Sequence, residues 1–279
     1  MNMNDRSVRI MGIVNITDNS YFAQSRCLSA DGAADMDVVR GRISAMLSEG
    51  ADIIDIGACS TRPGAPAVGA EVESERLAPV LEMIRDEFPD ITVSIDTYWA
   101  SVVVMAAEIL PSFAASGRLI INDIYAGRRD PQMLPSVGRL KLPFVAMHSL
   151  EETLDVSDYG GDVVDGVRSY FEEFARKAEE AGVEQWYLDP GFGFGKSVEQ
   201  NWELLDRMGE LSCFGKEILV GISRKSMIYR PLGITPEEAL PATQAAHVAV
   251  LDRGAGILRV HDVAETKRTI AVWRMIHNY

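Results

Sequence analysis

The sequence predicts an α/β fold, a (β/α)8 TIM barrel in which eight parallel strands alternate with helices. Eight short runs of the chain are apolar on both faces, as strands covered from both sides are. Amphipathic stretches with helical spacing lie between these runs. The chain has 279 residues, 47% of them hydrophobic, and barrels of about 250 residues build one core. We therefore expect a single domain over residues 1–279. The alternative is a doubly wound open sheet, although the first expected βα turn lacks the GxGxxG pattern of dinucleotide binding.

The apolar runs define the expected strands. In chain order, they are Arg9–Ile16, Asp52–Ile56, Ile91–Ile95, Leu119–Ile121, Pro143–Met147, Gln185–Leu188, Ile218–Gly221 and Gly256–Val260. The segments that follow Asp96 and Asp123 look shorter and less regular than the other connections.

The expected helices carry apolar residues three or four positions apart. Val39, Ile43 and Met46 make such a stripe, and Gly50 can end that helix in a left-handed conformation. Residues Thr235–Glu238 have the pattern of a capping box with proline at the first helical position, which predicts a helix from there to about Arg253. The remaining stripes cover Leu77–Phe88, Val163–Ala178, Trp202–Met208 and Val263–His277.

The composition limits the classes of partner. A net charge of −14 and a pI of about 4.8 argue against nucleic acid or an anionic membrane surface as a partner, because phosphates attract a basic face. The three cysteines, Cys27, Cys59 and Cys213, are an odd number without a CxxC pair and favour a reducing, cytoplasmic location. Residues 1–9 are polar and no run of 18 apolar residues occurs, so we expect a soluble protein that is not secreted.

The stretch Leu188–Lys196 is the first candidate site. Three glycines lie within five residues after an expected strand, and glycine allows a sharp turn and a close approach to a ligand. Asp189 ends the strand and Phe194 lies inside the turn. This pattern suits a flat heterocycle whose polar edge meets the carboxylate and whose face meets the phenyl ring. The alternative is a tight βα connection whose phenylalanines fill the barrel rim.

Other polar side chains also end expected strands, and in a barrel these ends meet at the face where active sites lie. Asp96 and Asn122 can converge with Asp189 on one ligand, because buried polar groups need partners. Met147 ends another strand and is most simply rim packing. Asn15, at the end of the first strand, either caps a turn or contacts a metal or a phosphate.

Cationic and hydroxyl side chains suggest an anion site at the same face. Lys225 and Ser226 follow a strand glycine, where a helix N-terminus favours an anion. Arg259 and His261 alternate along an extended segment, so both side chains point to one face and suit a diphosphate. Arg62, beside Pro63 and Gly64, is either a solvated loop charge or an anion clamp.

Taken together, these motifs resemble those of the dihydropteroate synthase family. They occur in the order of the family and span residues 10–263. The matching pieces are Asn15 with Thr17 and Ser20, Ser60–Gly64, Ser94–Thr97, Asn122-Asp123, Met147-His148, Asp189–Lys196 with Asn201, Ser223–Ser226 and Arg259–Val263.

The resemblance implies an activity and a role for each matching residue. The enzyme would condense 6-hydroxymethyl-7,8-dihydropterin diphosphate with p-aminobenzoate, assisted by Mg2+, to give 7,8-dihydropteroate and diphosphate, and it would form a homodimer. The implied catalytic residues are Asp96, Lys225 and Arg259. The implied pterin contacts are Asp96, Asn122, Met147, Asp189, Phe194, Lys225 and Arg259. The implied p-aminobenzoate contacts are Thr61, Arg62, Pro63, Phe194 and Ser226. The implied diphosphate contacts are Asn15, Arg62, Arg259 and His261, with Asn15 also binding the metal.

The chain departs from the family pattern at Asp18-Asn19, Ala58-Cys59 and Ser149–Glu152, which bears on loop ordering and turnover rate more than on pterin binding. Two other functions stay open. A methyltetrahydrofolate methyltransferase working with a corrinoid partner would share the pterin contacts but would not need Arg62 or the Arg259 and His261 pair. A non-catalytic pterin-binding paralogue is suggested only by the altered loops.

Overall fold

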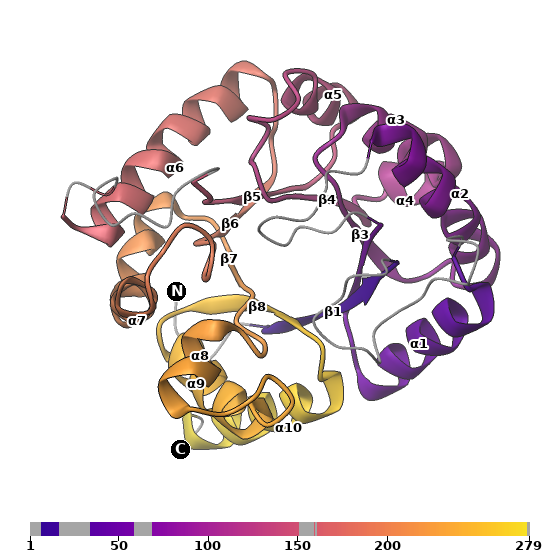
Figure 1. The fold of residues 1–279 in the computed structure, drawn as a ribbon. Helices are drawn as coiled ribbons and strands as arrows, with labels where there is room; N and C mark the ends of the chain where they lie inside the picture. The colour runs from indigo at the N-terminus through magenta and orange to yellow at the C-terminus, as the bar shows by residue number, and fades with distance from the viewer. Residues whose placement is uncertain (1–6, 17–33, 59–68, 151–158, 160, 278–279) are drawn as a thin grey trace.

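The computed structural model describes residues 7–16, 34–58, 69–150, 159 and 161–277. Eight parallel strands pair in sequence order, and the last strand pairs with the first, so the sheet closes into a barrel. Figure 1 shows the helices around the outside of this ring. The expected TIM barrel is confirmed. The open doubly wound sheet is excluded, because a closed sheet has no free edge strands.

The strands lie within two residues of their predicted bounds. They are short and almost entirely buried, which is why both-face hydrophobicity identified them. In order, they are β1 (Arg9–Asn15), β2 (Ile53–Gly57), β3 (Thr92–Asp96), β4 (Leu119–Asp123), β5 (Phe144–Met147), β6 (Trp186–Asp189), β7 (Ile218–Val220) and β8 (Ala255–Val260).

Helices follow the strands and cover the outside of the barrel. Within the described part of the chain, none of them is long and apolar enough to cross a membrane. The α-helices are α1 (Met36–Glu49), α2 (Ala70–Glu87), α3 (Ala100–Ile109), α4 (Pro111–Ala115), α5 (Met133–Leu140), α6 (Val163–Glu180), α7 (Val198–Arg207), α8 (Ser226–Leu232), α9 (Leu240–Asp252) and α10 (Val263–His277), and the 3-10 helix η4 (Met208–Phe214) follows α7.

Two helix ends behave as their local sequence demands. Gly50 ends α1 in the left-handed conformation, with φ of 100°, and its N–H donates to carbonyls of the last turn. Ser197 and Gln200 form a complete capping box at the start of α7. These ends fix the entry and exit angles of the two helices.

The predicted start of α9 is wrong. Glu238 does accept from the backbone N–H of Thr235, as in a capping box, but turns occupy residues 236–239 and the helix begins at Leu240. Pro241 explains the delay, because its nitrogen has no hydrogen to donate to the carbonyl of Glu237. That carbonyl instead accepts from the guanidinium of Arg224.

The barrel interior is layered. Seven strands contribute one side chain each to a closed apolar layer, which plugs the barrel below the site. Its members are Met11, Ile53, Ile120, Val145, Tyr187, Leu219 and Ile257. Above this layer, toward the carboxyl ends, the inward positions become polar. Asp96 is in register with Asn122, and Met147 with Asp189, so the barrel brings the expected pterin contacts to one level.

Candidate active site

An arginine between two buried carboxylates forms the polar floor of the site. Arg259 on β8 donates from Nε to Asp55 on β2 at 2.6 Å and from Nη2 to Asp96 on β3 at 2.7 Å. Asp55 is fully buried and Asp96 is 5% exposed. Asp55, which was not among the predicted site residues, is the second carboxylate of this cluster.

The cluster holds one more negative charge than positive charge. Burial raises the pKa of Asp96 to about 7; the nearby guanidinium of Arg259 opposes this rise, and the carboxylate of Asp55 adds to it. Burial opposes the charge on Arg259, but Asp55 and Asp96 keep the pKa of its guanidinium above the ordinary value. One guanidinium compensates one of two carboxylates, so near neutral pH Asp96 can hold or release a proton.

Asn122 and Asp189 complete the polar edge. Asn122 on β4 lies with its Nδ2 3.4 Å from both carboxylate oxygens of Asp55. Asp189 on β6 accepts the backbone N–H of Gly191 at 2.8 Å. Burial raises the pKa of Asp189, and Lys225 opposes the rise. The predicted convergence of Asp96, Asn122 and Asp189 at one face is therefore present.

The β6–α7 loop bears on the two interpretations of its glycines and phenylalanines, a site for a flat heterocycle and a filled barrel rim. Gly191 has φ of 68°, and a Cβ added there would lie 1.8 Å from the carbonyl oxygen of His148. Its close approach is thus to the backbone after β5, not to a ligand. Phe192 is fully buried in the core, as the rim-filling interpretation requires, whereas Phe194 is only partly buried. The ring of Phe194 remains available at the mouth of the barrel.

A cluster of apolar and aromatic side chains lies at the same end of the barrel. Tyr98, Ile124 and Met147 form a buried cluster against which Trp99, Tyr125 and Phe194 pack. The guanidinium of Arg129 lies over the rings of Tyr98, Trp99 and Tyr125, with its carbon 4.6 to 5.7 Å from their centroids. Sequence reasoning found Met147 and Phe194 but missed the other members. The signal was present in the aromatic residues that directly follow the polar ends of β3 and β4.

Lys225, one of the predicted anion-site residues, contacts the β6–α7 loop. Its Nζ donates to the carbonyl of Phe192 and lies 4.6 Å from the centroid of the Phe194 ring. Burial lowers the pKa of Lys225 to about 8, and the charge of Asp189 opposes this fall. The predicted helix start after Lys225 is confirmed, because α8 begins at Ser226.

His261 follows β8 at the same face. Its Nδ1 lies 3.1 Å from the hydroxyl oxygen of Ser223. Burial lowers the pKa of His261 to about 4, and Arg259 adds to this effect. The imidazole is therefore neutral at pH 7 and offers a hydrogen bond, while Arg259 offers the charge.

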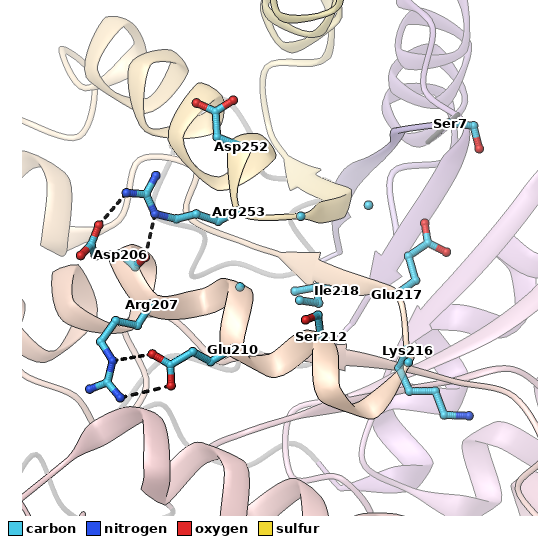
Figure 2. A pocket seen from close by; sticks show the side chains of 14 residues that line it. Ser7, Asp206, Arg207, Glu210, Ser212, Lys216, Glu217, Ile218, Asp252 and Arg253 are labelled. Atoms are coloured by element: carbon cyan, nitrogen blue, oxygen red, sulfur yellow. Dashed lines mark hydrogen bonds and ion pairs between the residues drawn. The ribbon is translucent and has the colours of Figure 1, made fainter. Parts of the chain in front are cut away.

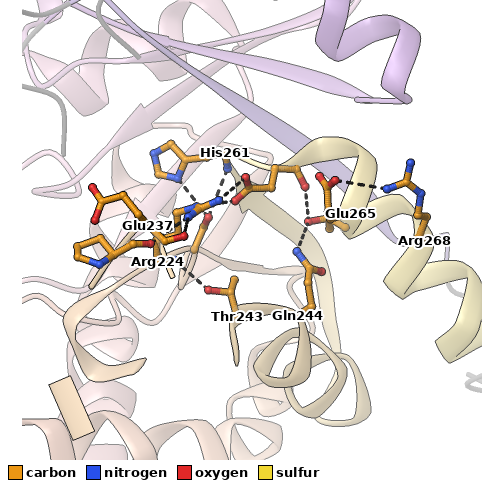
Figure 3. Close-up of polar contacts among 11 residues, drawn as sticks. Arg224, Glu237, Thr243, Gln244, His261, Glu265 and Arg268 are labelled. Atoms are coloured by element: carbon orange, nitrogen blue, oxygen red, sulfur yellow. Dashed lines mark hydrogen bonds and ion pairs between the residues drawn. The ribbon is translucent and has the colours of Figure 1, made fainter. Parts of the chain in front are cut away.

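A second arginine, Arg224, braces the loop between β7 and α8 (Figure 3). It pairs with Asp262 at 2.8 Å and donates to the carbonyls of Pro236 and Glu237. Its backbone adopts φ of 54°, an uncommon value for a residue with a side chain, and its N–H donates to Thr243. These contacts join the start of α10 to the segment before α9. They thereby fix the backbone that carries Lys225 and Ser226.

Some predicted residues are not placed. Thr61, Arg62 and Pro63 lie outside the described residues. Asn15 ends β1, is partly buried and pairs in register with Gly57 of β2. Among the described residues, no group of three or more His, Cys, Asp or Glu side chains could hold a metal ion. A Mg2+ ion needs fewer protein ligands than such a group offers, because substrate phosphates and water supply most of its ligands.

One depression lies elsewhere (Figure 2). It has a volume of about 880 Å3 and lies at the amino ends of β7 and β8, beside Ile218 and Gly254. Its two arginines are paired with carboxylates that also line it, since Arg207 bonds Glu210 and Arg253 bonds Asp206. Because the polar strand ends are at the opposite end of the barrel, we assign this depression no chemistry.

Comparisons with known proteins agree on one family. The family model described as pterin binding enzyme matches residues 11–261. The dihydropteroate synthase of Haemophilus influenzae is 36% identical over 274 residues, which cover 97% of this chain and 94% of that protein. A folic acid synthesis protein of Pneumocystis carinii is 36% identical over 96% of this chain, but the chain spans only 36% of its length.

Solved structures are similar over the whole chain. The dihydropteroate synthase of Clostridium difficile, determined in the presence of pteroic acid, has a TM-score of 0.86 and 34% identity, with 99% of both chains covered. The dihydropteroate synthase of Xanthomonas albilineans, determined with 4-aminobenzoic acid, has a TM-score of 0.85 and 36% identity, with 99% of this chain and 95% of that chain covered.

Proposed function

This chain belongs to the pterin binding enzyme family and, within it, to the dihydropteroate synthases, and we propose that it condenses 6-hydroxymethyl-7,8-dihydropterin diphosphate with p-aminobenzoate. The products are 7,8-dihydropteroate and diphosphate. The observation that carries this proposal is the convergence of Asp96, Asn122 and Asp189 beside the partly buried ring of Phe194. A buried polar edge next to an apolar face suits a flat heterocycle with hydrogen-bonding groups along one side.

The pterin would lie with its polar edge on the strand ends. Its ring N–H and amino groups can donate hydrogen bonds to the carboxylates of Asp96 and Asp189. The amide of Asn122 can both donate and accept. Lys225 would donate to the ring carbonyl, Met147 and Phe194 would line the ring pocket, and Arg259 would stack on the ring. The pairing of Arg259 with Asp96 must then loosen, so that the carboxylate can turn to the ligand.

The reaction breaks the bond between the pterin methylene carbon and the diphosphate oxygen. The bonding electron pair leaves with diphosphate, and the lone pair of the aromatic amine forms the new carbon–nitrogen bond, after which the amine loses a proton. Positive charge from Arg259 would stabilise the negative charge growing on the leaving group, and His261 would add a neutral hydrogen bond. An aromatic amine is already a neutral nucleophile, so the site needs no strong base. Asp96, Lys225 and Arg259 are the proposed catalytic residues.

The second substrate would approach over the same ring. Phe194 and Ser226 would contact p-aminobenzoate, together with Thr61, Arg62 and Pro63. Ser226 at the start of α8 can donate its hydroxyl proton to the benzoate carboxylate. Arg62 would contact both the diphosphate and the second substrate.

We propose Mg2+ as the metal of the reaction. Asn15 at the carboxyl end of β1 supplies a neutral amide oxygen, and hard oxygen ligands of this kind fit Mg2+ when a diphosphate provides the others. When bound, the ion neutralises charge on the leaving diphosphate. The residues of this chain orient the diphosphate by Asn15, Arg259 and His261.

Assembly and location are further proposals. We propose a homodimer, supported by three exposed apolar side chains near the end of α10, Val272, Met275 and Ile276, which are 53 to 62% exposed. Light scattering on the purified protein tests this state. A cytoplasmic location stays a prediction based on the cysteine pattern.

An assay of diphosphate release tests the proposed function. We expect release only when both pterin diphosphate and p-aminobenzoate are present, and a much slower release at low pterin diphosphate from an Asp189→Ala variant. Removing a charge-assisted hydrogen bond to a buried ligand costs roughly 1.5–3 kcal/mol, about 10–150-fold in affinity. Pterin binding without diphosphate release would indicate a non-catalytic paralogue. Methyl transfer from methyltetrahydrofolate to a corrinoid would indicate the methyltransferase.

A further inference from the structure

Lys196 is a buried cation on the β6–α7 loop that the proposed reaction does not use. It is only 4% exposed. Its Nζ lies 2.9 Å from the carbonyl oxygen of Gly191, 3.1 Å from that of Phe194 and 2.9 Å from Nδ1 of His148. All three partners are uncharged acceptors when His148 is neutral. Three acceptors need three N–H donors, the number that the ammonium form of lysine carries.

The charged form of Lys196 lies in a place that disfavours it. Burial lowers the pKa of Lys196 to about 7, and the nearby carboxylate of Asp189 opposes this fall. Burial and the charge of Lys196 lower the pKa of His148 well below its ordinary value, so its imidazole is neutral and can accept at Nδ1. An ammonium group that is desolvated among neutral acceptors is costly unless its hydrogen bonds are well formed. Here they are formed to two backbone carbonyls of the β6–α7 loop and to the imidazole of His148.

These hydrogen bonds tie the loop together and to β5. Gly191 begins the loop, and its N–H donates to Asp189, so fixing this residue by its carbonyl also orients that carboxylate. Phe194 carries the ring at the mouth of the barrel. His148 directly follows β5. At the far end, Asn201 of α7 donates to the carbonyl of Lys196 and accepts the N–H of Gly193.

We propose that Lys196 is a positioning residue for pterin binding, because its ammonium group fastens the β6–α7 loop to the end of β5 and so holds Asp189 and Phe194 in the orientation that the pterin requires. The identity of the ligand rests on the proposed function. The fastening of the loop does not depend on the proposed function, because the hydrogen bonds of Lys196 are made within the chain itself.

The loop can be tested in the protein without ligand. Lys196→Met removes all three donors at similar length, and Lys196→Gln retains two of them. Lys177→Met is the matched control, because Lys177 lies on the surface of α6 with its side chain 48% exposed. We expect amide hydrogen exchange at Gly191, Gly193 and Phe194 to become about tenfold faster or more in the methionine variant, less so in the glutamine variant, and unchanged in the control.

Ligand binding tests the consequence. Titration with 6-hydroxymethyl-7,8-dihydropterin should show a dissociation constant raised about tenfold or more in Lys196→Met and partly restored in Lys196→Gln. In turnover, the KM for the pterin diphosphate should rise by a similar factor, while kcat at saturation changes little. This split follows because the proposed role of Lys196 is to preorganise the site, not to touch the reacting atoms.

The outcomes separate the two proposals. Unchanged exchange in the loop of Lys196→Met would overturn the role of Lys196, even if the enzyme were fully active. A lower melting temperature with wild-type pterin affinity would also overturn it, because the residue would then serve stability alone. Faster exchange in a protein whose wild type neither binds pterin nor releases diphosphate would support the fastening of the loop and refute the proposed function. If the methionine variant does not fold, the glutamine variant decides by the same measurements.

Discussion

Asparagine in place of Asp55 would remove one carboxylate from the cluster around Arg259 while keeping the size of the side chain. Asp55 is fully buried and bonds Nε of Arg259 at 2.6 Å. Removing one partner of a buried ion pair costs about 3–5 kcal/mol when the other charge is left alone. In the variant, Arg259 still has its ion pair with Asp96, at 2.7 Å in the structure. We therefore expect the free energy of unfolding to fall only by the value of one charge-assisted hydrogen bond, about 1.5–3 kcal/mol.

This cost should depend on pH, because in the wild type two carboxylates share one guanidinium. The pKa of Asp96 is about 7 in the folded protein against an ordinary value of 3.8, with burial the main cause. The folded state therefore holds the proton more tightly. The resulting stabilisation is fully present below about pH 4 and is lost as the pH rises to 7, by up to about 1.4 kcal/mol per pH unit. Burial of Asp96 remains in the variant, but the raising contribution of Asp55 is removed, so the pKa of Asp96 falls and this loss becomes smaller.

The variant should accordingly be less stable than the wild type by about 1.5–3 kcal/mol at pH 5 and by less at pH 8. Urea denaturation at the two pH values measures this difference. Asp206→Asn is a suitable control, because its side chain is 72% exposed in its pair with Arg253, and it should change stability by no more than about 0.5 kcal/mol at either pH. An equal loss of stability by Asp55→Asn at pH 5 and pH 8 would refute the reasoning.

Three further predictions concern ligands. The dissociation constant of 6-hydroxymethyl-7,8-dihydropterin should fall as the pH rises through about 7, because only the ionised Asp96 accepts from two ring donors, and isothermal titration of Asp96→Asn should show no such step. In steady-state kinetics, Ser226→Ala should raise the KM for p-aminobenzoate by roughly 2–13-fold, the value of one hydrogen bond, and leave the KM for the pterin diphosphate unchanged. The reverse pattern would mean that the two substrates are placed the wrong way round. Chelation of divalent ions by EDTA should abolish diphosphate release, and added Mg2+ should restore it, whereas binding of the pterin that lacks diphosphate should be unaffected.

The features that local sequence determines were predictable. Strands such as β4 are buried on both faces, and that burial leaves a run of apolar residues in the sequence. The polar residues Asp96, Asn122 and Asp189 interrupt these runs at their carboxyl ends, and barrel geometry then brings them together. The end of α1 at Gly50 followed from the backbone preference of glycine alone.

Features that depend on contacts between distant segments were not predictable. Asp55 and Arg259 are 204 positions apart and meet only because β8 closes on β1 beside β2. Pro241 was a local signal for the later start of α9, but the guanidinium from the β7–α8 loop that takes the carbonyls of Pro236 and Glu237 had none. The direction of the Lys196 side chain, inward to His148, has no local signature, since lysine is mostly a surface residue.

The contact between Gly191 and the carbonyl of His148 also bears on how the gene can change. Every first- or second-base change in a glycine codon either ends the chain or introduces a residue with a Cβ, and a Cβ here would lie 1.8 Å from that oxygen. The left-handed backbone at this position, with φ of 68°, adds strain for any such residue. Codon 191 therefore tolerates only silent change. In a mutational library of the gene, position 191 should be among the first to show complete depletion of substitutions.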